Sequence, residues 1–204
     1  MGITFKPLGL IAYPTALDLM RQFNTARSED TKDEIWILEH PHVITLGIST
    51  KENQVKPGTP IQVITTDRGG QATCHNPGQL VIYFLLDLKR LSITIKSFVS
   101  HLEQSIISSL KYYGIDAYTK QGKPGVFVAD KKIASLGLRI SHGYTSHGIG
   151  LNICNDLSIF SHIHPCGNPL QQVTSMQSLG VESTVEEVAT TLIPILNHEL
   201  TSTL

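Results

Sequence analysis

Residues 132–152, KIASLGLRISHGYTSHGIGLN, predict two strands joined by a tight turn. The strands cover Lys132–Ile140 and Tyr144–Ile153, and Ser141-His142-Gly143 separates them. We therefore expect a β-hairpin, and this hairpin is the starting point for the fold.

The hairpin is unusually rich in small residues: Ala134, Ser135, Gly137, Gly148 and Gly150. Such residues would leave an empty slot in an otherwise packed sheet. A slot of this kind suits an extended alkyl chain, whose burial stabilises by about 0.8 kcal/mol per methylene. In the alternative interpretation, the glycines only relieve crowding or form bulges.

Further strands are expected around the hairpin. Short apolar runs predict strands at 1–11, 34–39, 43–46, 61–66, 80–88 and 126–128. The 80–88 run has no polar alternation, so this strand should be buried on both faces.

Three helices complete the expected fold. The first covers 13–27 with Thr15 as its cap, and the second covers 92–113 and ends at Gly114. The last begins at Thr184 with a capping box to Glu187, and Pro194 should kink it. Since strands and helices mix without strict alternation, we expect one α+β domain over residues 1–204, a mixed β-sheet with flanking helices.

The composition is that of an ordinary globular protein. The net charge of -1 provides no basic field, so we expect no nucleic-acid partner. Three cysteines without paired spacing indicate a reducing compartment. MGITFKPLGL does not have the pattern of a signal peptide, and the longest apolar run is too short to cross a bilayer. We therefore expect a cytoplasmic protein without a membrane partner.

The segment 161–176, SHIHPCGNPLQQVTSM, places Cys166 between Pro165 and Gly167. Proline fixes the backbone and glycine removes bulk, so the thiol should be exposed and held in place. An exposed, positioned thiol is typical of a nucleophile, with a structural cysteine or a metal ligand as the alternatives. His162 and His164 alternate with Cys166 and could share a zinc ion with it, but they give only three ligands, and we expect no metal.

The segment 67–80, DRGGQATCHNPGQL, follows a predicted strand. Its paired glycines, Gly69 and Gly70, allow the backbone to approach a ligand and donate N–H groups to it. We consider these N–H groups, and those of the Cys166-Gly167 turn, as donors to an oxyanion. The alternative is a plain turn before the next strand.

Taken together and in this order, RGGQATCHNPGQ, KIASLGLRI with HGIGLNI, and PCGNPLQQVTS resemble the lipoyl(octanoyl) transferase family. The resemblance implies the biotin/lipoate protein ligase-like fold and an acyltransferase without a cofactor. Its members move an octanoyl group from octanoyl-acyl carrier protein to a lysine of a lipoyl domain, in 2-oxoacid dehydrogenases and in the glycine cleavage H protein. This is a step in lipoate biosynthesis.

The resemblance also assigns site residues. It implies that Cys166 forms an acyl thioester and that Lys132 is paired with it as the second catalytic residue. The implied substrate-binding residues are Arg68, Gly69, Gly70, Gln71, Ala72, Thr73, Cys74, His75, Ser135, Leu136, Gly137, Gly148, Ile149 and Gly150.

This chain departs from the family pattern at four positions. It has Cys74 and Asn76 around the histidine of the first motif, where the family has an aromatic residue and a glycine. It has Ile149 and Gly150 where the family often has Phe-Ala. The loss of aromatic bulk is expected to widen or reshape the slot.

Several residues keep two interpretations. Cys74 should point away from His75, because neighbours on a strand face opposite sides, and Cys154 could lie near the slot. Lys132 is expected to stabilise a thiolate and then to act as base, unless it is a surface lysine. His75 and His147 could shape the site, bind a carbonyl or be structural.

Two other functions compete with acyl transfer through a thioester. An ATP-dependent lipoate or biotin ligase on the same fold would need no thiol. A non-catalytic module that binds acyl groups or lipoyl domains would form no covalent intermediate.

Overall fold

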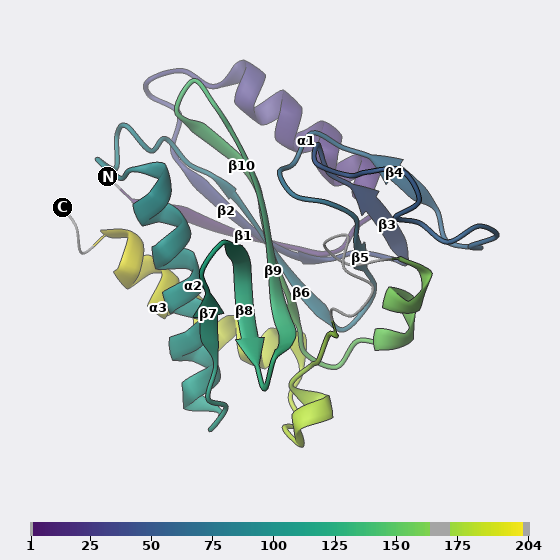
Figure 1. Cartoon of the computed structure of the whole chain (residues 1–204). Helices are drawn as coiled ribbons and strands as arrows, with labels where there is room; N and C mark the ends of the chain where they lie inside the picture. Colours follow the sequence, from purple (N-terminus) through teal and green to yellow (C-terminus); the bar gives the residue numbers. More distant parts are fainter. Residues whose placement is uncertain (1, 164–171, 202–204) are drawn as a thin grey trace.

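The computed structural model describes residues 2–163 and 172–201, which form two sheets and the helices that cover them (Figure 1). The larger sheet has the strand order β1-β2-β6-β10-β9-β8-β7, and the smaller one has the order β4-β3-β5. The strands of the larger sheet are β1 (Thr4–Leu10), β2 (Glu34–Glu39), β6 (Gln79–Leu85), β10 (Tyr144–Asn152), β9 (Lys131–Ser141), β8 (Lys123–Val128) and β7 (Tyr118–Lys120). Those of the smaller sheet are β4 (Val63–Thr65), β3 (Val43–Leu46) and β5 (Thr73–His75).

The larger sheet is mixed, as the sequence predicts. β1 pairs with β2 in parallel, and the remaining neighbours in this sheet are antiparallel. The α+β expectation is thereby confirmed. β5 and β7 were not predicted, because each contains only three residues and neither shows a clear alternation of apolar and polar side chains.

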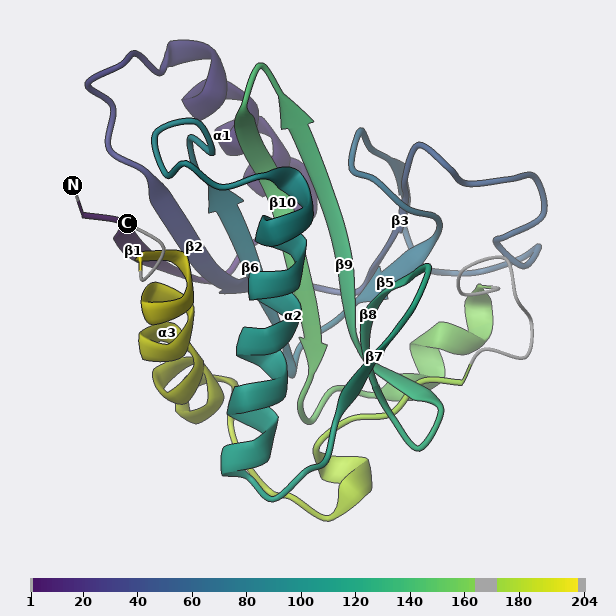
Figure 2. The ribbon, with the colours of Figure 1, turned by 60° about the vertical axis from the view of Figure 1, so that its left-hand side comes forward.

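The helices are α1 (Tyr13–Ala26), α2 (Ile95–Tyr112) and α3 (Val185–Thr201), with two short 3-10 helices, η1 (Leu157–His162) and η3 (Gln177–Leu179). α2 and α3 lie side by side on one face of the larger sheet, and α1 lies on the other face (Figure 2). None of the helices in the described residues is both long and apolar enough to cross a membrane.

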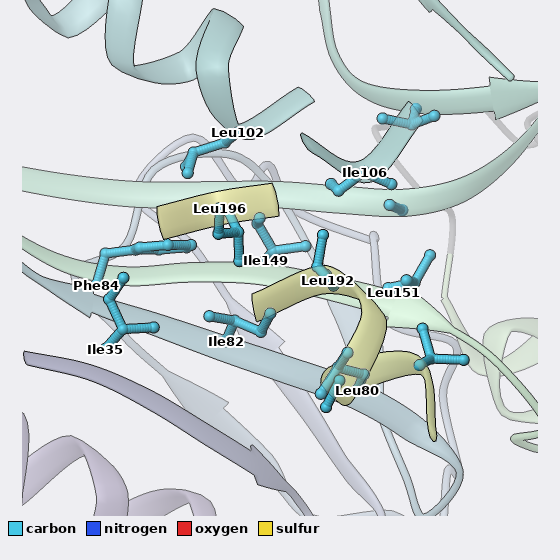
Figure 3. Packing of buried hydrophobic residues seen from close by; sticks show 14 of the residues in the cluster. Ile35, Leu80, Ile82, Phe84, Leu102, Ile106, Ile149, Leu151, Leu192 and Leu196 are labelled. Carbon is cyan, nitrogen blue, oxygen red and sulfur yellow. The ribbon is translucent and has the colours of Figure 1, made fainter. Parts of the chain in front are cut away.

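Strand β6 contributes buried side chains to both faces of the larger sheet, and all seven of its residues are buried. Leu80, Ile82 and Phe84 point into the core beneath α2 and α3 (Figure 3). The alternate residues Val81, Tyr83 and Leu85 pack with α1. A strand buried on both faces has no polar alternation, which is why this segment was recognisable in the sequence.

The predicted hairpin is present as β9 and β10, with Tyr144 opposite Ser141. His142 and Gly143 connect the strands with φ values of 56° and 93°. Two successive residues with positive φ form the type I′ turn, whose twist matches that of the strands.

One of the two N-terminal caps predicted from the sequence is present. Thr184 and Glu187 form the predicted capping box at α3: the Glu187 N–H donates to Thr184 Oγ1 over 3.2 Å, and the Thr184 N–H donates to Glu187 Oε2 over 2.8 Å. Thr94 caps α2, and Gly114 follows its end with a φ of 74°. The predicted cap of α1 is wrong: Ala12 takes the cap position without a side-chain hydrogen bond, and a proline in the first turn starts the helix instead.

Candidate active site

A cavity of about 500 Å³ lies against β9 and β10, on the side of the 68–75 segment. All the substrate-binding residues predicted from the sequence line it except Cys74. The other residues in its wall are Tyr13, Tyr83, Val99, Gly122, Lys123, Pro124, Phe127, Lys132, Leu138, His147, Phe160 and Val173. The slot expected between the small residues of the hairpin is therefore a real cavity, of the size that small-ligand sites have.

The turn Arg68–Gly70 lies directly on the hairpin. The Arg68 guanidinium is buried and donates to Thr45 and to the Gly69 carbonyl, and the Gly69 N–H donates to the Leu138 carbonyl over 2.8 Å. A Cβ on Gly69 would lie 2.9 Å from that same carbonyl oxygen. The Gly69 N–H is thus committed to β9, and the expectation that it binds an oxyanion is wrong.

Two glycines of the hairpin relieve crowding as well as line the cavity. A Cβ on Gly137 would lie 3.2 Å from Arg68 Cδ, and a Cβ on Gly148 would lie 2.0 Å from the Ile82 carbonyl oxygen. Ala134 lies in the core under the helices and does not reach the cavity. Both interpretations of the small residues therefore hold, at different positions.

Lys132 lies in the cavity wall and not on the surface, since only 7% of the residue is exposed. Its Nζ donates to the Pro124 carbonyl over 2.9 Å and lies 5.3 Å from the centre of the Phe127 ring. Gly125 makes room for it: its φ is 127°, and a Cβ there would lie 3.2 Å from Nζ. The alternative of a surface lysine is wrong.

The backbone of Lys132 pairs with the segment that follows Cys166 in the sequence. The Lys132 N–H donates to the Gln172 carbonyl over 2.9 Å, and the Thr174 N–H donates to the Lys132 carbonyl over 3.0 Å. Cys166 and His164 themselves lie outside the described residues. In the described part of the chain, no group of histidine, cysteine, aspartate or glutamate side chains could hold a metal ion.

The other two cysteines are poor nucleophiles. Cys74 is fully buried next to Ile44 and Ile159, and burial raises the pKa of its thiol to about 12. Its Sγ lies 3.5 Å from the Ile159 carbonyl, so it faces away from the cavity, and its small size does not widen the slot. Cys154 is exposed and absent from the cavity wall, and partial desolvation of its thiol and the nearby Glu39 raise its pKa.

A chain of hydrogen bonds orients His75 in the cavity wall. Asn152 Nδ2 donates to the Thr174 carbonyl, Gln79 Nε2 donates to Asn152 Oδ1 over 2.9 Å, and Gln79 Oε1 lies 2.7 Å from His75 Nδ1. Nδ1 must therefore carry the proton, which leaves Nε2 as an acceptor. Burial and the neighbouring His40 lower the pKa of His75 to about 3, so the ring is neutral.

Two tyrosines in the wall turn their hydroxyl groups away from the cavity. The Tyr13 hydroxyl donates to Thr66 Oγ1 over 3.0 Å, and the Tyr83 hydroxyl lies 2.7 Å from His40 Nε2. Because His40 Nδ1 donates to the Ile11 carbonyl, its Nε2 accepts from Tyr83. The sequence analysis missed both tyrosines. Tyr83 could have been found, because it follows Ile82 on a strand buried on both faces and its side chain must therefore point to the opposite face from Ile82.

The described wall thus combines mostly apolar surface with one buried amine, Lys132, one exposed amine, Lys123, the buried Arg68 side chain and neutral imidazoles. Such a wall can bury an extended hydrocarbon chain and place its polar end beside the amine of Lys132.

Comparisons with known proteins support this chemistry. Residues 12–196 match the family model of the lipoyl protein ligase A/B catalytic domain. The chain is 47% identical to an octanoyltransferase of Laribacter hongkongensis, over 96% of this chain and 94% of the relative. It is 43% identical to an octanoyltransferase of Methylococcus capsulatus, over 98% of this chain and 97% of the relative.

Solved structures share the fold. A putative lipoate protein ligase of T. acidophilum with bound lipoic acid superposes with a TM-score of 0.79 at 17% identity, over 98% of this chain and 86% of the other. Biotin protein ligase of Aquifex aeolicus in complex with biotin and ATP gives a TM-score of 0.61 at 14% identity, over 98% of this chain and 70% of the other. The expected ligase-like fold is confirmed.

Proposed function

The chain belongs to the octanoyltransferases of the lipoyl protein ligase A/B catalytic-domain family, and on that premise we propose that it transfers octanoate through a thioester on Cys166. The donor is octanoyl-acyl carrier protein. The acceptor is the lysine of a lipoyl domain, as in 2-oxoacid dehydrogenases and the glycine cleavage H protein. The reaction takes place in the cytoplasm, where thiols stay reduced.

The observation that carries the proposal is the cavity itself. It is lined by residues 68–73 and His75, and by residues 135–137 and 148–150 of the hairpin, and Lys132 lies in the same wall. Burial of an octanoyl chain in it stabilises the complex by roughly 5 kcal/mol, at about 0.8 kcal/mol for each of six or seven methylenes.

Cys166 is the nucleophile for three reasons. Cys74 and Cys154 both have raised pKa values and lie outside the cavity wall. Cys166 is six residues from Gln172, whose carbonyl accepts from the Lys132 N–H, so the chain between them spans at most about 20 Å. The Pro-Cys-Gly sequence favours an exposed thiol.

In the first half-reaction, the Cys166 thiolate attacks the carbonyl carbon of the octanoyl thioester on the carrier. The carrier thiolate leaves and takes a proton from Lys132, whose amine becomes neutral, and the octanoyl group stays on Cys166. A positive charge on Lys132 stabilises the Cys166 thiolate before the attack. The Gly70 N–H remains a candidate donor to the oxyanion, together with those of the Cys166-Gly167 turn.

In the second half-reaction, the acceptor lysine attacks the Cys166 thioester and forms an amide. A lysine with a pKa of about 10.4 is neutral in about one part in a thousand near pH 7.5. Lys132, neutral at this stage, takes the proton that the acceptor amine loses, and the Cys166 thiolate leaves. Removal of that proton lowers the barrier by up to roughly 4 kcal/mol.

The test is the intact mass of the protein after incubation with octanoyl-acyl carrier protein in the absence of ATP. We expect one added octanoyl group, located on Cys166 by peptide mapping and lost in the Cys166→Ala variant. Cys154→Ala is the matched control and should keep the adduct.

Two outcomes would contradict the proposal. A chain that only binds its partners would gain no covalent group. A ligase would transfer free octanoate in the presence of ATP, and it would do so equally well in the Cys166→Ala variant.

A further inference from the structure

A second hollow, of about 220 Å³, lies beside the first cavity, between α1 and the β9–β10 hairpin. It is more polar, with Arg21, Asp67 and Arg139 in its wall. His147 lines both spaces, so its ring stands between them. The sequence analysis singled out His147, but the proposed reaction does not use it.

His147 is held in an unusual conformation. Its φ is 59°, a left-handed backbone that residues other than glycine rarely adopt. The His147 Nε2 lies 2.8 Å from Asp67 Oδ1. The backbone N–H of His147 donates to Met20 Sδ over 3.4 Å. Asp67 is in turn 3.0 Å from Arg139. Strain of this kind persists where the surroundings fix it, often at functional sites.

The other ring nitrogen of His147, Nδ1, makes no hydrogen bond with the described residues. The His147 side chain is 2% exposed, and this nitrogen is buried. Burial outweighs Asp67 and lowers the pKa of His147, while the hydrogen bond from His147 lowers the pKa of Asp67 to about 2. The ring is thus neutral, with its proton on Nε2 and a lone pair on Nδ1.

The strand register places His147 at the far end of the slot from Lys132. Along β9 and β10 the pairs follow in the order Ser135 with Gly150, Gly137 with Gly148, and Leu138 with His147. The Lys132 side chain extends along β9 to the level of Ala134, because a Cβ on Gly125 would lie 2.6 Å from the Ala134 carbonyl oxygen and 3.2 Å from Lys132 Nζ. From Ala134 to Leu138 a strand covers roughly 13 Å, which is close to the length of an extended octanoyl chain beside the amine. An acyl chain whose carbonyl lies near Lys132 therefore points its methyl end towards His147.

We propose that His147, held by Asp67, ends the acyl slot and thereby sets the length of chain that the enzyme accepts. This inference rests on the proposed octanoyl transfer. A chain with further methylenes would have to displace the His147 ring, which its hydrogen bond to Asp67 and its packing in the wall hold in place. Without the His147 ring, the slot and the second hollow would join, and longer chains would fit.

The experiment compares wild type with His147→Gly, because glycine adopts the left-handed backbone of this position without strain. Transfer rates are measured with octanoyl- and decanoyl-acyl carrier protein. Each buried methylene is worth roughly a factor of four in binding, so we expect the two extra methylenes to raise the decanoyl-to-octanoyl ratio about fifteenfold. His147→Asn, which also tolerates this backbone, is the second variant and should shift the ratio in the same direction.

Arg21→Ala is the matched control. Arg21 lines only the second hollow and lies 3.9 Å from Asp67, so its removal enlarges that hollow without opening the partition, and the ratio should not change. Calorimetric titration of the same variants with octanoate and decanoate measures the affinity of the slot for each chain length without any transfer. The two His147 variants should gain decanoate affinity by a similar factor.

The outcomes separate the two proposals. If wild type transfers octanoate but both His147 variants keep the wild-type ratio and binding preference, His147 does not set chain length, and the proposed function stands. If the calorimetric preference shifts while wild type forms no acyl adduct on Cys166, the role of His147 stands and the thioester mechanism fails.

Discussion

The two faces of the larger sheet are built from the same strands but differ in what fills them. Beneath α2 and α3, Leu80, Ile82 and Phe84 of β6 join a continuous apolar core (Figure 3). On the other face, the side chains include His40, His75 and Tyr83, and part of the space is the cavity. We call the face beneath α2 and α3 the helix face and the opposite face the cavity face. We infer that the helix face supplies most of the stability and that the cavity face supplies the chemistry.

The largest expected loss of stability is on the helix face. Leu192 of α3 is fully buried in this core, so Leu192→Ala should lower the free energy of unfolding by about 2–5 kcal/mol. Denaturant unfolding measures this. The transfer rate per folded molecule should be unchanged, and a large fall in that rate would break the division between the faces.

The opposite behaviour is expected for Lys132 on the cavity face. Lys132→Arg keeps a charge but removes a group that can act as a base, so the transfer rate should fall by about 10²–10⁴. Stability should change much less than in Leu192→Ala. Normal transfer with octanoyl-acyl carrier protein would show that no base is needed at this position.

The cavity face should also make the protein sensitive to acid. Burial lowers the pKa of His75 to about 3 and that of His40 to about 4, so below pH 6.5 the unfolded chain binds protons that the folded chain does not. Stability should therefore fall with falling pH, by about 1.4 kcal/mol per pH unit for each histidine, from pH 6.5 down to about pH 4.

Denaturant unfolding at pH 7, 6 and 5 measures this slope. The variant His75→Gln should reduce it, because it removes one of the buried histidines with a lowered pKa. His142→Gln, at the exposed β9–β10 turn, is the matched control. The same slope in wild type and His75→Gln would contradict the assignment.

The smallest expected effects compare two glycines of β10. A Cβ on Gly148 would meet the Ile82 backbone, whereas a Cβ on Gly150 would meet only the end of the Gln79 side chain at 3.1 Å. Gly148→Ala should therefore cost about 1–3 kcal/mol and Gly150→Ala less than about 1 kcal/mol. Thermal unfolding of the two variants tests the order, and equal losses would show that the backbone at Gly148 can shift.

Much of this arrangement was predictable because local signals and tertiary structure agree. The strands 34–39 and 43–46, the hairpin and the capping box of α3 are where the sequence places them. The small residues at 135, 137, 148 and 150 predicted the slot, since empty space in a sheet needs side chains that do not fill it.

What could not be predicted depends on contacts between distant segments. Cys74 was expected to bind substrate, but the direction of β5 turns it towards Ile159, 85 positions away. The Gly69 N–H pairs with Leu138, and Tyr13 reaches the cavity from α1. No local pattern encodes these contacts, which arise only when the two sheets come together.

The orientation of the two cavity tyrosines determines which of their groups a bound octanoyl chain would contact. Tyr13 donates its hydroxyl to Thr66, and Tyr83 donates its hydroxyl to His40, so only the rings of these residues border the bound chain. In the proposed reaction, an octanoyl thioester held in the cavity would therefore meet neither of these hydroxyl groups. Neither tyrosine would then compete with the acceptor lysine for the octanoyl group.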